Sequence, residues 1–204
     1  MADNKYLLSF TAGALLYRES LAVTELFEEL GDWAAVREHV MDDNLLQMRT
    51  PSASKRVFRE VFGRLEQLTT AELTLLRIGL SQEQSHLLWL GVCKRYRFIC
   101  DFAVEVVREK FIRFDFDLSY DDYDIYFSNK AEWHPEVAGV AESTRKKLRQ
   151  VLFRMMREAN LLTVDNQILP ALLTPRTVEV IAADSPSYLL AFPTSPTEIQ
   201  EWLS

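Results

Sequence analysis

One segment constrains the fold more than any other: residues 84–111 are apolar around most of a helical circumference. Such a helix has to be covered by neighbours on nearly every side, because exposed apolar surface is unfavourable in water. We therefore predict a long central helix with the rest of the chain packed around it. Lys94, Arg95, Tyr96 and Arg97 interrupt the apolar pattern. They are expected to mark the exposed side of this helix, with stacking and pairing against nucleic acid as the alternative.

The rest of the chain also reads as helices with recognisable ends. Apolar residues at helical spacing fill residues 10–30, and Gly31 ends that pattern. Asp32 can then cap a helix from Trp33 to about Asp42. Further starts are predicted at Ser52 or Ser54, Thr70, Ser81, Ser119, Ser143 or Thr144, and Thr174. The pattern indicates a mainly α-helical protein with helix-turn-helix or winged-helix units.

The predicted helices divide the chain into four parts. Residues 1–80 form an N-terminal helical domain with a helix-turn-helix-like unit, and residues 81–112 form the central helix. Residues 113–183 form a winged-helix-like domain. Residues 184–204 are rich in Ser and Pro and form a mostly irregular tail, which Phe192 and Trp202 are expected to anchor.

A basic helix followed by a short β-hairpin is predicted between Ser143 and Pro170. Asn160 can adopt the left-handed conformation that ends a helix, and turn residues then separate two short apolar runs. This is the outline of a winged helix, whose basic outer face would contact phosphates. The candidate contacts are Arg145, Lys146, Arg149, Arg154 and Arg157. The alternative is a surface helix whose cations are merely solvated.

A second basic helix is predicted from Lys55 to Leu68. It follows two helices and a tight connection, which is the position of a recognition helix in a helix-turn-helix. Its candidate phosphate contacts are Lys55, Arg56, Arg59 and Arg64. The alternative is a structural helix that Phe58 and Phe62 hold in the core.

The charge distribution allows a local site for nucleic acid but not a uniformly basic protein. The net charge is −7 and the isoelectric point is near 5.1. A concentrated basic strip can still face phosphate. Acids dominate from Asp115 to Asp124, but this run lacks the spacing of a calcium-binding loop. Ser119 with Asp121 and Asp122 fits a helix start better, so we predict no metal site.

The sequence carries no recognisable catalytic or cofactor motif, so we expect a protein that is not an enzyme and needs no cofactor. His39, His86 and His134 lack the spacing of a zinc site, and no glycine-rich phosphate loop or nucleophile elbow is present. Cys93 and Cys100 lie in the apolar helical segment and fit reduced, buried thiols. We find no signal peptide and no apolar run long enough to span a membrane, which favours a cytoplasmic protein.

Several stretches together resemble the BrxA family of bacteriophage exclusion (BREX) systems. They are LSFTAGALLYRES (Leu8–Ser20), LGDWAAVRE (Leu30–Glu38), WLGVCKRYRFICDFAVEV (Trp89–Val106), NKAEWHPE (Asn129–Glu136), TRKKLRQVLFRMMREANLL (Thr144–Leu162) and ILPALLTP (Ile168–Pro175). The resemblance implies an intracellular defence component that is largely helical, with winged-helix character and a likeness to the helical core of the antitermination factor NusB. It also implies binding to double-stranded DNA without known catalysis, alongside other BREX components.

These observations lead to one functional hypothesis and two alternatives. The hypothesis is a non-enzymatic component of a BREX system that contacts duplex DNA phosphates through its basic helices. One alternative is an adaptor that docks other defence proteins through its charged surfaces. The other is RNA binding, for which Tyr96 and Tyr17 would supply exposed aromatic rings. Two basic helices on the same side would form one DNA-facing strip with the acidic stretch turned away. On opposite sides, the protein would either bridge two duplexes or use only one of the helices, and the helix followed by the hairpin, between Ser143 and Pro170, is then the expected site.

Overall fold

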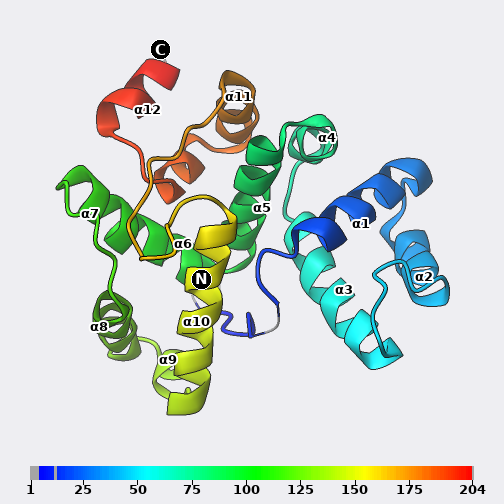
Figure 1. The fold of residues 1–204 in the computed structure, drawn as a ribbon, viewed down its shortest axis with the longest axis horizontal. Helices are drawn as coiled ribbons and strands as arrows, with labels where there is room; N and C mark the ends of the chain where they lie inside the picture. Colours follow the sequence, from blue (N-terminus) through cyan, green and yellow to red (C-terminus); the bar gives the residue numbers. More distant parts are fainter. Residues whose placement is uncertain (1–4, 12, 204) are drawn as a thin grey trace.

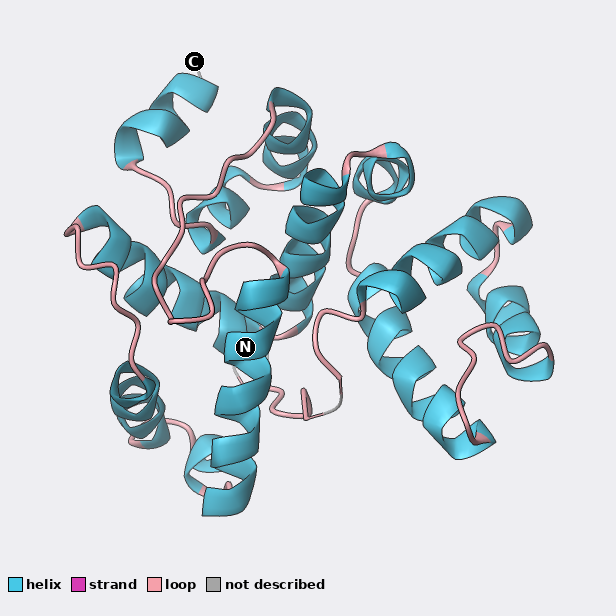
Figure 2. Cartoon of the chain, in the orientation of Figure 1, coloured by secondary structure: helices cyan, strands magenta, loops and turns pink. Residues whose placement is uncertain are grey.

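The computed structural model describes residues 5–11 and 13–203 (Figure 1). Within this part of the chain the protein is mainly helical and contains no β-strand (Figure 2). The α-helices are α1 (Tyr17–Leu30), α2 (Trp33–Asp42), α3 (Pro51–Leu65), α4 (Thr70–Ile78), α5 (Ser81–Arg95), α6 (Arg97–Phe102), α7 (Glu109–Ile112), α8 (Tyr120–Ala131), α9 (Pro135–Ala138), α10 (Glu142–Glu158), α11 (Pro175–Asp184) and α12 (Pro196–Leu203). A π-helical segment, η1 (Ala103–Arg108), precedes α7, and a 3₁₀ segment, η2 (Pro186–Ala191), follows α11. None of the described helices combines the length and the apolarity needed to cross a membrane.

Helices α1, α2 and α3 form one group of the fold, and α5 stands between this group and the helices from α6 onward (Figure 1). Local signals set the ends of these helices, as predicted. Gly31 ends α1 with a φ of 65°, a value that glycine adopts without strain. The Asp32 carboxylate accepts a hydrogen bond from the Ala35 amide at 2.9 Å and so caps α2. Helix α3 begins earlier than predicted, because Thr50 caps it and Pro51 occupies its first position.

The central helix is present but is not continuous. Every residue of α5 from Glu83 to Cys93 is buried, as its apolar circumference predicts. At Tyr96 the backbone leaves the helical conformation, with φ −118° and ψ 85°. The Tyr96 hydroxyl donates a 2.6 Å hydrogen bond to the buried Glu60 carboxylate of α3. The break therefore directs this side chain inward, where it joins the central helix to the N-terminal group.

The prediction that Lys94 and Tyr96 lie on an exposed side is wrong. The Lys94 ammonium is buried and lies 2.6 Å from a Glu72 carboxylate oxygen and 2.9 Å from Asp184. Tyr96 is also buried, and the half-buried Tyr17 donates its hydroxyl to Gln84. The Tyr96 ring is therefore closed to RNA bases, and the Tyr17 ring is only partly exposed.

His86 lies in the core of α5 without a hydrogen-bond partner for either ring nitrogen among the described residues. Burial lowers its pKa from the usual 6.5 to about 4. The unfolded chain therefore takes up a proton first as the pH falls, and stability is lost between about pH 6.5 and pH 4. We expect this histidine to remove about 2–3 kcal/mol of unfolding free energy on going from pH 7 to pH 4.5. Urea unfolding of the wild type and of His86→Phe at both pH values measures this contribution. The free energy of unfolding of His86→Phe should fall by about 2–3 kcal/mol less than that of the wild type. An equal fall in the two proteins would contradict the prediction.

The segment after α7 departs from the predicted winged helix. Ser119 caps α8 as predicted, but α10 begins at Glu142 and not at Ser143 or Thr144. Asn160 does adopt a left-handed conformation, with a φ of 58°. The predicted β-hairpin is not confirmed: a single bridge joins Leu162 to Ile168, and no strand forms in the described part of the chain.

The C-terminal tail is more regular than predicted. Thr174 caps α11, and two further helical segments, η2 and α12, replace the irregular tail. Phe192 is buried, as expected of an anchor, and the Trp89 indole donates a 3.0 Å hydrogen bond to the Ala191 carbonyl. Trp202 is partly buried against the core. The tail thus covers one side of α5.

Candidate nucleic-acid interface

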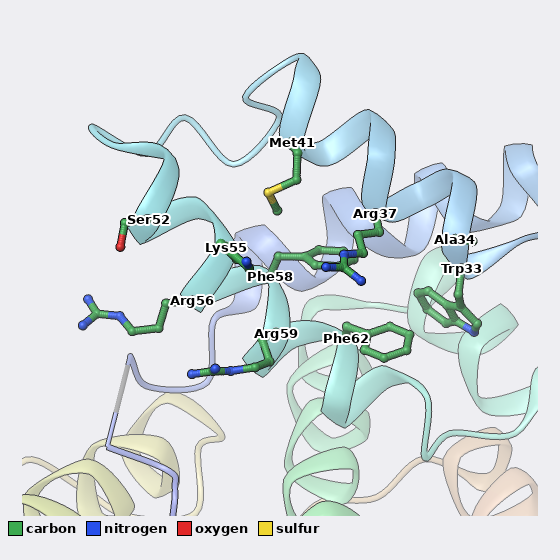
Figure 3. A pocket seen from close by; sticks show the side chains of 10 residues that line it. All are labelled: Trp33, Ala34, Arg37, Met41, Ser52, Lys55, Arg56, Phe58, Arg59 and Phe62. Carbon is green, nitrogen blue, oxygen red and sulfur yellow. The ribbon is translucent and has the colours of Figure 1, made fainter.

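A groove of about 700 Å³ lies between α2 and α3 (Figure 3). Its walls combine aromatic and aliphatic side chains with several cations, and no carboxylate takes part. The lining residues are Trp33, Ala34, Arg37, Met41, Ser52, Lys55, Arg56, Phe58, Arg59 and Phe62. The groove therefore joins part of one predicted basic helix to a helix that the sequence had not marked as functional.

Packed aromatic rings form the apolar part of the groove. The Trp33 ring stacks on Phe27 of α1 with ring centroids 3.9 Å apart, and it meets the Phe62 ring edge-on at 5.3 Å. Phe58 lies 5.9 Å from Phe62 on the same face of α3. Because each ring is held by a neighbour, these walls are preformed.

The rim of the groove is cationic and uncompensated. Lys55 and Arg56 are adjacent on α3, Arg59 lies one helical turn after them, and Arg37 projects from α2 toward α3 (Figure 3). All four are exposed and form no ion pair with any described residue. Like charges three or four residues apart destabilise a helix slightly, so these cations do not add to the stability of α3. In a chain with a net charge of −7, this rim concentrates positive potential on one surface.

Arg64 does not belong to this rim, although it lies on the same helix. It is buried, and its guanidinium donates hydrogen bonds to the Ala14 carbonyl at 2.8 Å and the Leu15 carbonyl at 3.4 Å. Glu60 lies 3.6 Å away, and burial lowers the pKa of Arg64. Arg64 ties the N-terminal segment to α3 and cannot reach a phosphate in this structure.

The cations of α10 are placed differently, because acids of the same chain hold many of them. Arg145 donates to the Asp124 carboxylate at 3.0 Å and to the Asp124 carbonyl at 2.7 Å. Arg149 pairs with the same carboxylate and lies over the Tyr120 ring. These contacts fasten α10 to α8, so Asp124 of the acidic stretch faces the basic helix, while Asp115 and Asp122 pair with Lys110.

The remaining α10 candidates are partly engaged. The Lys146 ammonium lies 2.6 Å from Glu142, and Arg154 lies 2.8 Å from Glu158. Arg157 is half-buried and donates a 2.6 Å hydrogen bond to the Asn166 side chain. The structure thus brings Lys55, Arg56 and Arg59 together at one groove. The candidate residues of α10 lie outside this groove, and most of them contact acidic side chains nearby.

Sequence reasoning missed Trp33, Arg37 and Met41. They are four residues apart and therefore lie on one face of α2. This spacing is the one sign in the sequence that could have grouped them. That signal does not say which helix this face meets. The pairing of α2 with α3 is a tertiary contact, and it turns a mixed face into the wall of a groove.

Comparison with known proteins supplies the family. The sequence profile of the BrxA family matches residues 4–185. A "BREX protein BrxA" from Escherichia coli O9:H4 is 26% identical over 157 residues, covering 77% of this chain and 74% of the relative. Another from Bacillus cereus is 27% identical over 160 residues, covering 78% and 80%. A crystal structure of an uncharacterized protein from Magnetospirillum magneticum superposes with a TM-score of 0.80 at 21% identity, covering 93% of this chain and 98% of that one, and so shares the fold. The chain belongs to the BrxA family.

Proposed function

We propose that this chain is a non-enzymatic, cytoplasmic component of a BREX phage-defence system that binds duplex DNA through the rim of the α2–α3 groove. One observation carries the proposal: Arg37, Lys55, Arg56 and Arg59 are exposed together without an acidic partner among the described residues. The names of its relatives as BREX proteins support a place beside other BREX components.

Phosphate binding would give these uncompensated cations a partner of opposite charge. Cations that neutralise phosphates release condensed counterions, and this release supplies most of the affinity for DNA of any sequence. The net charge of −7 makes the rest of the surface unfavourable to DNA, so the rim selects the orientation of the complex. Exposed Lys146 and Arg154 contribute less, because Glu142 and Glu158 of the same helix pair with them.

A titration of duplex DNA across salt concentration tests the proposal. Four phosphate contacts predict that log K falls with log salt with a slope of about −3.6. Affinity that does not change with salt, or the absence of binding at low salt, would contradict the proposal. Adding RNA as competitor separates the RNA alternative, since preferential displacement by single-stranded RNA would favour it.

The adaptor alternative is favoured by a specific observation, the apolar lining of the groove. A protein partner with acidic and apolar side chains would complement it. Retention of other BREX proteins after nuclease treatment, together with no binding to purified DNA, would favour the adaptor and exclude the DNA proposal.

A further inference from the structure

The apolar part of the groove has no role in binding an intact duplex. Duplex DNA presents phosphates and sugars outward and keeps the faces of its bases stacked, so its backbone can occupy the cationic rim alone. Trp33, Met41 and Phe62 would then remain as a partly exposed apolar wall, with the buried Phe58 behind it. A preformed concave site that combines apolar walls with a few polar groups is the usual form of a binding pocket.

We infer that the groove between α2 and α3 takes an unpaired DNA base, while its cationic rim holds the phosphates on either side of that base. This rests on the proposed DNA binding and specifies which form of DNA the site prefers. An unstacked base is the one flat, apolar part of DNA, and it always comes with flanking anions. Aromatic walls and basic rims recur together where proteins bind unpaired nucleotides.

The geometry suits this occupant in two respects. Phe27 backs the Trp33 ring at 3.9 Å and Phe62 meets its edge, so no ring has to be ordered when a base enters. Cations stand on both helices, with Arg37 on α2 and Lys55, Arg56 and Arg59 on α3 (Figure 3). A base held between the helices would therefore have a cation within reach on both sides.

The test compares a plain duplex with the same duplex carrying one bulged nucleotide. We expect the purified full chain to bind the bulged duplex about tenfold more tightly in a fluorescence anisotropy titration, equivalent to about 1.4 kcal/mol. With 2-aminopurine as the bulged base, its fluorescence should fall on binding, because stacking on an aromatic ring quenches it.

A matched pair of variants tests whether the preference for bulged DNA arises in the groove. Ala34 is exposed, lines the groove and is the second residue of α2, so Ala34→Leu fills the groove without removing a charge. Ala71 is exposed and is the second residue of α4, away from the groove, so Ala71→Leu is the control. Ala34→Leu should bind both DNAs with the affinity of the wild type for the plain duplex, and Ala71→Leu should keep the tenfold preference. Phe62→Leu, which removes a ring and no charge, replaces Ala34→Leu if thermal unfolding shows that Ala34→Leu is misfolded.

The outcomes separate this inference from the proposed function. Equal affinity for plain and bulged duplexes overturns the base pocket and leaves duplex binding in place, whereas no binding to either DNA overturns both. The inference is overturned if Ala34→Leu still prefers the bulged duplex, or if the 2-aminopurine fluorescence does not fall on binding. The preference for bulged DNA would then come from the flexibility of that DNA.

Discussion

Replacing Lys55, Arg56 and Arg59 together by Gln is expected to weaken duplex DNA binding by a few hundredfold at 0.1 M salt. Each phosphate contact contributes about 0.9 to the salt slope, so the loss of three contacts should also make the slope less steep by about 2.7. Because these side chains are exposed and form no ion pairs among the described residues, the fold should be unaffected. Anisotropy titrations at several salt concentrations measure both quantities.

The matched control lies on the other basic helix. Replacing Lys146, Lys147 and Arg154 by Gln changes the net charge by the same amount on another exposed surface. We expect this variant to lose no more than about tenfold and to keep most of the salt slope, as a purely long-range effect of net charge would give. Equal losses in the two triple variants would mean that DNA does not distinguish the helices, and a larger loss in the control would move the site to α10.

Replacing Lys94 by Met is expected to lower the free energy of unfolding by about 3–5 kcal/mol. The side chains of Lys94 and Glu72 are 4% and 0% exposed. Methionine keeps most of the packing of the lysine stem but leaves Glu72 as a buried charge without its counter-ion. Urea unfolding measures the loss.

The neighbouring residue provides the control for this effect. Arg95 also pairs with an acid, Glu66, but both side chains are about one-third exposed. Arg95→Met should therefore cost about 1 kcal/mol or less. If burial of the charge is the cause, adding Glu72→Gln to Lys94→Met should restore part of the stability. Similar losses of unfolding free energy for Lys94→Met and Arg95→Met would show that the buried ion pair contributes no more to stability than the exposed one.

Signals within a few residues of a helix end predicted much of the fold. Asp32, Ser119 and Thr174 cap helices as expected, and Gly31 and Asn160 end them in left-handed conformations. Each of these depends on a bond between close neighbours in sequence, which is why pattern reading found them.

Features set by distant contacts were not predictable in the same way. The break at Tyr96 directs its hydroxyl to Glu60, 36 residues away, and no local pattern announces that partner. Lys94 was expected in solvent because a lysine is seldom buried without a partner, and its partners belong to α4 and α11. The engagement of Arg145 and Arg149 likewise depends on Asp124 of α8, which reaches α10 only in the folded chain.

A photo-crosslinking measurement tests most directly whether DNA lies on α3. Ser52 and Ser143 are both exposed and are each the second residue of a basic helix, α3 and α10. With p-benzoylphenylalanine introduced at one position at a time, labelled duplex DNA should crosslink efficiently at position 52 and weakly at position 143. Efficient crosslinking at position 143 with little at position 52 would contradict the placement of DNA at the α2–α3 groove.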